Sequence, residues 1–245
     1  MSSYDEFRFL DVTARDGIVH AELTHPDYDH AERLEWGRLF AAVADDPDSR
    51  VLVLSGWSNP RRGHPGTMFE DFDAFRYYDR ALKDPVIAML ELDTPIVVAL
   101  DGNPGVLTIP LSGDYVIAEE QLSFSDNHVK IGTASATQPF LCAPSMGLMR
   151  AKRHILTGRP FTAQEAVDMG LMAEVVPTGQ ALGRAMEVAE EIAALRPEAV
   201  AATKRNLNQW LLRARQDVFA HGLALEFMLF PADFAEAQRR RATGA

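Results

Sequence analysis

Three features of this sequence predict an α/β fold. Short, continuously apolar runs that end at turn residues indicate strands buried on both faces of a sheet. Segments with apolar residues at helical spacing lie between these runs, and such alternation is typical of a layered α/β core. The second half of the chain has mostly helical patterns. With 245 residues, the chain is long enough to bury a large core.

Most of the predicted strands lie in the first half of the chain. Residues 18–23 follow an Asp-Gly turn signal and mix β-branched with polar residues, as at the boundary of a sheet. Residues 51–54 and 95–100 are continuously apolar, which is the pattern of a fully buried strand. Residues 115–118 are a weaker example, and residues 174–176 are a short one before a proline. These runs predict the core of the sheet.

Helices are predicted wherever apolar residues recur every three or four positions. Thr162 and Glu165 form a capping-box pattern that marks the start of one of them. The helices are expected at residues 31–43, 69–92, 163–170, 181–195, 198–214 and 218–230.

Composition and charge exclude several classes of protein. Lys and Arg total 24 and Asp and Glu total 35, so the net charge of −11 argues against nucleic-acid binding. No apolar run reaches the roughly 20 residues of a membrane span, and the start of the chain lacks the apolar stretch of a secretory signal. The single cysteine, Cys142, cannot form an internal disulfide. We therefore expect a cytoplasmic protein without membrane or nucleic-acid partners.

Four segments carry motifs in a recognisable order. They read RVLVLSG at 50–56, PIVVALDG at 95–102, DYVIAEE at 114–120 and LTGRPFTAQEA at 156–166. The second is similar to the pattern PVIAAVNG, and the fourth to LTGxxxxAxEA. In this order, and over nearly the whole chain, the segments resemble the crotonase (enoyl-CoA hydratase/isomerase) superfamily.

The resemblance implies a crotonase-like spiral of ββα repeats with a C-terminal helical region. Residues 1–180 would form the spiral core, and residues 181–245 a helical trimerisation region, in a homotrimer or a dimer of trimers. The implied chemistry uses an oxyanion hole, in which two backbone N–H groups hold the oxygen of a carbonyl or thioester as an enolate forms. No cofactor is implied, since coenzyme A would enter only as part of a substrate. No metal is expected, because no His, Cys or Asp cluster has ligand spacing.

The first oxyanion-hole loop of the family, AGxDL, falls on residues 64–69. Gly66 is kept, and Thr67 occupies the position of the backbone donor. Met68 stands where the family has Asp, and His64 lies in the same loop. The resemblance therefore implies that Thr67 donates to the oxyanion, and that His64, Gly66 and Met68 border the substrate.

The second donor normally comes from a GGG stretch that opens a helix. Here the corresponding segment, residues 102–110, is shorter and lacks that triplet. Leu107 or a neighbour would supply the second N–H group. The catalytic Glu of this helix falls on Thr108, which cannot act as a general acid near neutral pH and is expected to contact substrate instead.

His128 occupies the position of the family's other catalytic glutamate. The family pattern is FGxPEVxLG, and residues 124–132 read FSDNHVKIG. An imidazole with its ordinary pKa of about 6.5 suits general-base catalysis at neutral pH. Both glutamates of the ordinary hydratases are therefore absent, which argues against hydration by paired carboxylates.

Two more segments resemble the carbon–carbon hydrolases of the superfamily, which cleave cyclic 1,3-diketones, as 6-oxocamphor hydrolase does. Residues 109–114 match their Ile-Pro-x-x-x-Asp pattern, and a GLALE segment ending at Glu226 matches their helix whose Glu pairs with the catalytic His. The resemblance implies a dyad of His128 and Glu226 that activates water. The acidic residue of their next loop is missing here, so Asp126 and His64 are the candidates for protonating the leaving enolate.

Three functions stay open at this point. The first is an acyl-CoA enzyme, resembling a hydratase, an isomerase or a thioester hydrolase, with His128 as its base. The second is a hydrolase that cleaves a cyclic 1,3-diketone with the His128–Glu226 dyad. The third is a catalytically silent subunit or binding module. We favour the first, since acyl-CoA substrates dominate the superfamily, although the His and Glu pattern favours the second.

Overall fold

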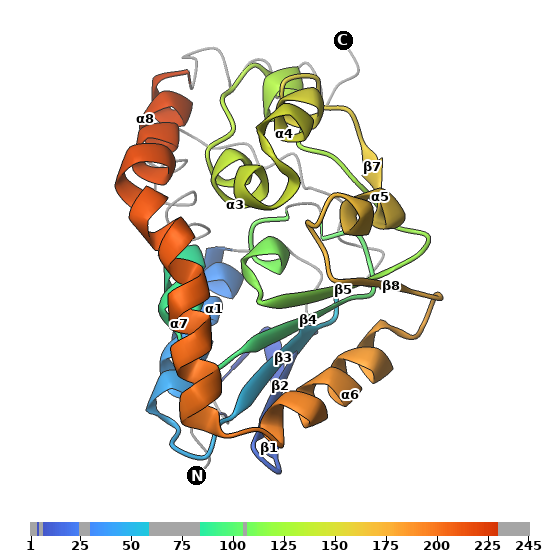
Figure 1. The fold of residues 1–245 in the computed structure, drawn as a ribbon, viewed down its shortest axis with the longest axis vertical. Coiled ribbons are helices and arrows are strands. Elements are labelled where there is room, and N and C mark those ends of the chain that lie inside the picture. Colours follow the sequence, from blue (N-terminus) through green and yellow to red (C-terminus); the bar gives the residue numbers. More distant parts are fainter. Residues whose placement is uncertain (1–3, 5–6, 25–29, 59–83, 105–106, 230–245) are drawn as a thin grey trace.

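A six-stranded sheet forms the centre of the computed structural model, which describes residue 4 and residues 7–24, 30–58, 84–104 and 107–229 (Figure 1). The strand order is β1-β2-β3-β4-β5-β8. The first pair is antiparallel, and every other pair is parallel. The strands are β1 (Leu10–Arg15), β2 (Ile18–Leu23), β3 (Val51–Ser55), β4 (Ile96–Leu100), β5 (Tyr115–Glu119) and β8 (Glu174–Val176).

Both faces of the sheet are covered. β3 and β4 are buried at every position, as their continuous apolar runs predict. Alternate side chains of a strand point to opposite faces. Val53 and Val97 pack with the alanine-rich helix α6 (Ala181–Ala193) on one face, where Figure 1 shows that helix.

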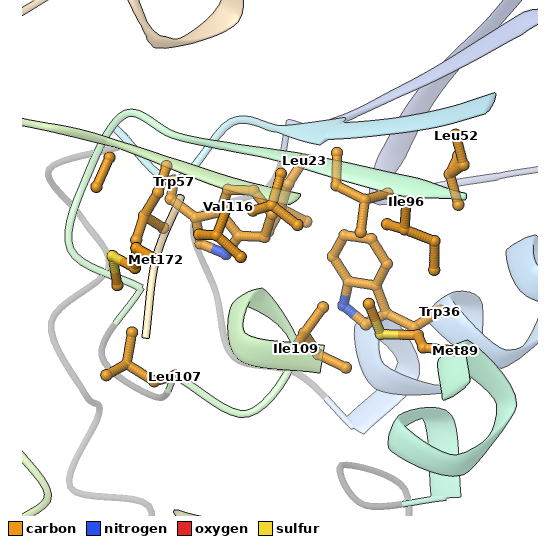
Figure 2. Close-up of a cluster of buried hydrophobic side chains, with 14 of the residues drawn as sticks. Leu23, Trp36, Leu52, Trp57, Met89, Ile96, Leu107, Ile109, Val116 and Met172 are labelled. Carbon is orange, nitrogen blue, oxygen red and sulfur yellow. The ribbon is translucent and has the colours of Figure 1, made fainter. Parts of the chain in front are cut away.

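The opposite face of the sheet carries the larger part of the core. Trp36 of α1 (His30–Asp45) lies there with Met89, Ile96 and Ile109, as Figure 2 shows. The ring of Trp36 stacks on that of Trp57 with centroids 6.4 Å apart.

The remaining helices lie over the face of the sheet opposite α6 and along one side of the sheet (Figure 1). Residues 84–91 are helical. The short strands β6 (Ser123–Phe124) and β7 (Phe161–Thr162) pair with each other. The other elements are the 3-10 turns η1 (Pro110–Ser112) and η2 (His128–Ile131), the helices α3 (Thr137–Met146), α4 (Leu148–Ile155), α5 (Ala163–Asp168) and α7 (Pro197–Ala214), the π turn η3 (Arg215–Ala220), and α8 (His221–Met228).

Local sequence signals predict most of these elements. The capping box is confirmed, since Thr162 accepts a hydrogen bond from Glu165 N and the Glu165 side chain accepts one from Thr162 N. The strands and α-helices that the sequence does not predict are β1, β6, β7, α3 and α4. β1 lacks alternation because it is exposed over most of its length, and α3 contains Pro144, a residue that ordinarily interrupts a helix.

Two of the predicted helices differ from the structure in extent. Of the helix expected at 69–92, only residues 84–91 are described. The last helix, expected at 218–230, is instead α8 preceded by the π turn η3, so it continues from α7.

An ion pair between the buried Lys204 and the partly exposed Asp114 fastens α7 to the sheet. Lys204 Nζ lies 2.7 Å from Asp114 Oδ2 and donates to the carbonyl of Thr94 at 3.0 Å. Asp114 Oδ2 also accepts a hydrogen bond from Ile96 N at 2.7 Å. Burial raises the pKa of Asp114 and lowers the pKa of Lys204, while each group's charge acts in the opposite direction on the other.

The predicted division at residue 180 coincides with the start of α6. That helix packs on the sheet, so it shares the core of the elements before it. The separation into residues 1–180 and 181–245 therefore stays a prediction. Over the residues that the structure describes, no helix combines the length and apolar character that crossing a bilayer demands.

A candidate active site around His128

The imidazole of His128 is held by a short local turn. Asp126 Oδ1 accepts a hydrogen bond from the backbone N–H of His128 at 3.0 Å, the arrangement in which an Asp side chain closes a turn two residues ahead. The same oxygen lies 2.5 Å from His128 Nδ1. Gly132 ends the turn with a φ of 83°, a left-handed conformation that favours glycine. The backbone thus sets the carboxylate and the imidazole side by side.

Asp126 is ionised next to that ring. Burial acts to raise the pKa of its carboxyl, but the hydrogen bonds and charge of His128 outweigh burial and hold the pKa below its ordinary value. A carboxylate bound at Nδ1 favours the tautomer with a proton on Nδ1, and leaves Nε2 with a lone pair that can accept a proton. Asp126 therefore lies where it can orient the imidazole.

Glu226 approaches the other ring nitrogen from α8. Its Oε1 lies 3.7 Å from His128 Nε2, and its side chain is only 4% exposed. This distance is too long for a direct hydrogen bond but suits an ion pair once the ring is protonated. The structure thus brings together the two members of the dyad expected from the sequence.

Within the described part of the chain, three side-chain oxygens between residues 126 and 137 are buried without a hydrogen bond. They are Asp126 Oδ2, Thr133 Oγ1 in the segment after η2, and Thr137 Oγ1 in the first turn of α3. Thr133 N donates to the carbonyl of His128, which ties that segment to the turn. A buried polar atom without a partner destabilises a fold. Such atoms are therefore rare in native proteins, and a functional site is one of the places where they are retained.

Of the two predicted oxyanion donors, the structure describes Leu107. Its backbone N–H donates no hydrogen bond to any described residue, although its carbonyl accepts one from Leu111 N at 2.9 Å. Thr108 is buried, and its carbonyl accepts a hydrogen bond from the Ser112 hydroxyl. A backbone N–H without a hydrogen-bond partner among the described residues is compatible with an oxyanion donor.

The other predicted site residues, His64, Gly66, Thr67 and Met68, lie outside the described residues. Their roles stay predictions. Among the part of the chain that is described, no group of three His, Cys, Asp or Glu side chains is arranged to hold a metal ion.

The sequence proposed Asp126 as a proton donor and did not indicate its contact with Nδ1. The sequence did contain an indication of this proximity, because an Asp side chain often accepts a hydrogen bond from the backbone N–H two residues later, which here is that of His128. No local signal could show that Glu226 reaches Nε2 rather than Nδ1, since the two residues meet only through packing of α8.

Comparisons with known proteins agree with this architecture. Enoyl-CoA hydratase EchA19 of Mycobacterium tuberculosis is 26% identical over 212 residues, which cover 79% of this chain and 76% of that protein. An enoyl-CoA hydratase/isomerase from Mycobacterium paratuberculosis has a TM-score of 0.81 at 26% identity, covering 97% of this chain and 100% of that one.

A more distant structure has a different described activity. A β-diketone hydrolase from the cyanobacterium Anabaena, bound to (S)-3-oxocyclohexyl acetic acid, matches with a TM-score of 0.78 at 22% identity over 98% of both chains. At that identity the likeness concerns the fold. The crotonase-type α/β fold expected from the sequence is thereby confirmed. The family model for enoyl-CoA hydratase/isomerase matches residues 31–245, and the chain therefore belongs to that family of enzymes.

Proposed function

We propose that this enzyme acts on an acyl-CoA thioester, as hydratases and isomerases of the family do, with His128 as general base in place of the usual glutamate. The observation that carries the proposal is the contact between Asp126 Oδ1 and His128 Nδ1 at 2.5 Å. This contact orients an imidazole at the position of the family's catalytic carboxylate. The acyl-CoA class rests on the family match and on a relative described as an enoyl-CoA hydratase.

The proposed chemistry needs one base and one oxyanion hole. In a hydration, Nε2 of His128 takes a proton from water as the water oxygen bonds to the β-carbon of the enoyl thioester. The electron pair of the double bond moves onto the thioester oxygen, which the N–H groups of Leu107 and Thr67 would hold. The imidazolium then returns a proton to the α-carbon, so that the elements of water are added. Each donor contributes about 3–4 kcal/mol to such a transition state.

Two carboxylates favour the protonated ring that this step creates. Asp126 is ionised, as its lowered pKa requires, and Glu226 lies on the Nε2 side at 3.7 Å. Opposite charges at this distance stabilise an imidazolium. The arrangement therefore lowers the barrier to removing a proton from water.

A second candidate is hydrolysis of the carbon–carbon bond of a cyclic 1,3-diketone. The specific observation in its favour is the position of Glu226, which completes the His and Glu pair that the sequence resemblance implies. Here the water activated by His128 attacks one carbonyl carbon. The bond to the central carbon breaks, leaving a carboxylic acid and an enolate that takes up a proton. The Anabaena β-diketone hydrolase has the same fold, so the fold is compatible with this chemistry.

The deciding experiment is a turnover screen of enoyl-CoA thioesters and cyclic 1,3-diketones with the wild type, His128→Ala and His221→Ala. His221 is an exposed histidine of α8, so its variant controls for loss of an imidazole. We expect turnover of a CoA thioester that falls about 10²–10⁴-fold in His128→Ala and is unchanged in His221→Ala. Cleavage of a diketone alone would replace the first candidate by the second. Undiminished turnover in His128→Ala would reject both.

The exposed apolar side chains of α7 bear on the oligomeric state of the protein. Leu207 and Trp210 on α7 are 66% and 80% exposed, which is unusual for large apolar side chains and supports an oligomer built through the helical region. We propose a homotrimer or a dimer of trimers, with coenzyme A present only as part of the substrate. Light scattering during size-exclusion chromatography measures the assembly directly.

A further inference from the structure

One glycine allows α8 to approach α3 closely. A Cβ atom on Gly222 would lie 3.0 Å from Ala136 Cα and 3.1 Å from Ala136 Cβ, and these distances are shorter than nearly all real contacts of this kind. Gly222 lies inside a helix and is absent from the glycines with positive φ. Since glycine is less favourable than alanine within a helix, its presence here is explained by the close approach and not by backbone conformation.

The same face of the helical segment carries the residues that anchor it and the residue that reaches the site. Phe219 lies three positions before Gly222 and stacks on Phe140 of α3, with ring centroids 5.0 Å apart. Phe140 is itself four positions after Ala136, so both contacts are made to one side of α3. Glu226, four positions after Gly222, follows on that face and extends to His128.

We propose that Gly222 is a positioning residue, whose missing side chain sets the distance between Glu226 and His128. The inference rests on the role of His128 proposed above. With an alanine at position 222, the neighbours must move apart by a few tenths of an ångström to relieve the contact with Ala136. Because Glu226 is carried by the same short helix, its carboxylate moves away from Nε2, and the imidazolium loses part of its stabilisation.

The test compares Gly222→Ala with Gly183→Ala. Gly183 also lies inside a helix, α6, but among the described residues no atom beyond its chain neighbours and the backbone of its own helix lies within 4 Å of the Cβ it would gain. Gly183→Ala should keep full activity and raise the melting temperature by roughly 2–4 °C. Gly222→Ala should lower kcat by about 3- to 10-fold with little change in KM, because a small displacement of a catalytic group acts on the transition state.

Three measurements separate positioning from a general loss of structure. The acidic limb of the pH–rate profile should move to lower pH in Gly222→Ala, in the same direction as in Glu226→Gln, while Asp126 still faces the ring. The effects of Gly222→Ala and Glu226→Gln should not add in the double variant, because both act through one carboxylate. Ala136→Gly should restore part of the lost kcat, since it removes one of the clashing atoms.

The outcomes also separate this inference from the proposed function. Loss of activity in His128→Ala and Glu226→Gln, with wild-type kcat in Gly222→Ala, would reject the role of Gly222 alone. Additive effects of Gly222→Ala and Glu226→Gln would reject it as well. Full activity in His128→Ala would instead reject the proposed function. If Gly222→Ala does not fold, the double variant Gly222→Ala/Ala136→Gly is compared with the wild type instead. A crystal structure of either variant should show more than 3.7 Å between Glu226 Oε1 and His128 Nε2.

Discussion

Two partly buried clusters of charged side chains in this protein differ in how completely their polar atoms are hydrogen-bonded. Between α7 and the sheet, Lys204 bonds both Asp114 and the carbonyl of Thr94, and Asp114 also accepts from a backbone N–H. Beside His128, the Asp126 Oδ1 atom has two close partners, whereas its buried Oδ2 atom has no hydrogen bond of ordinary geometry with any described residue. The first cluster has the completeness of a structural contact, and the second has the incomplete bonding typical of a functional site.

The pKa values of Asp114 and Asp126 are also shifted in opposite directions from the ordinary value. Burial raises the pKa of Asp114 although Lys204 lies beside it. For Asp126, burial acts in the same direction, but the contacts with His128 outweigh it and the pKa falls below the ordinary value. A buried carboxyl is thus not diagnostic of function without its partners. The neighbouring groups decide whether it stays charged at the pH of the reaction.

The largest effect should come from Asp126→Asn. An amide can offer its N–H to Nδ1, which favours the tautomer whose Nε2 already carries the proton and cannot act as a base. We expect kcat to fall about 10²–10⁴-fold. Because the lowered pKa of Asp126 means that its ionised form favours the folded state, the variant should also lose part of the free energy of unfolding in urea at neutral pH. Wild-type kcat in this variant would show that Asp126 does not orient the base.

Asp114→Asn should affect stability and not catalysis. The change leaves the buried ammonium of Lys204 without its counter-ion, and breaking a fully buried pair from one side costs about 3–5 kcal/mol. Asp114 is partly exposed and its ionisation opposes folding, so we expect a smaller loss in urea unfolding, with the kcat of the folded protein unchanged. A fall in kcat without loss of stability would contradict the separation of the two clusters.

A smaller effect should appear in the pH dependence of stability. The folded-state pKa of Asp126 lies below its unfolded value, so its contribution to stability is present above the unfolded pKa of 3.8 and is lost as pH falls through the folded pKa. Asp114 has the opposite sign, because its folded-state pKa is raised above 3.8 and its ionisation opposes folding as pH increases.

Urea unfolding between about pH 5 and pH 3 measures this contrast. Asp126→Asn should flatten the loss of stability of the wild type on acidification. Asp114→Asn should make that loss steeper, because the wild-type Asp114 gains relative stability as it is protonated. Parallel curves for the wild type and both variants would contradict the two pKa directions.

Much of the fold follows from local patterns in the chain. The continuously apolar runs of β3 and β4 and the capping box before α5 are visible in the sequence, because burial on both faces and helix capping depend on residues close together. The strand β1 is different. Its side chains are mostly exposed, and it is held by backbone pairing with β2, which leaves no apolar alternation to detect.

The candidate site likewise has a part that local sequence predicts and a part that it does not. His128 at the position of a family glutamate, and Asp126 two residues before it, are set by neighbouring residues, since the turn that joins them is local. The position of Glu226 depends on the stacking of Phe219 on Phe140 and on the contact of Gly222 with Ala136. Those contacts join segments far apart in the chain, so their distances follow from how α8 packs on α3 and from no pattern within either segment.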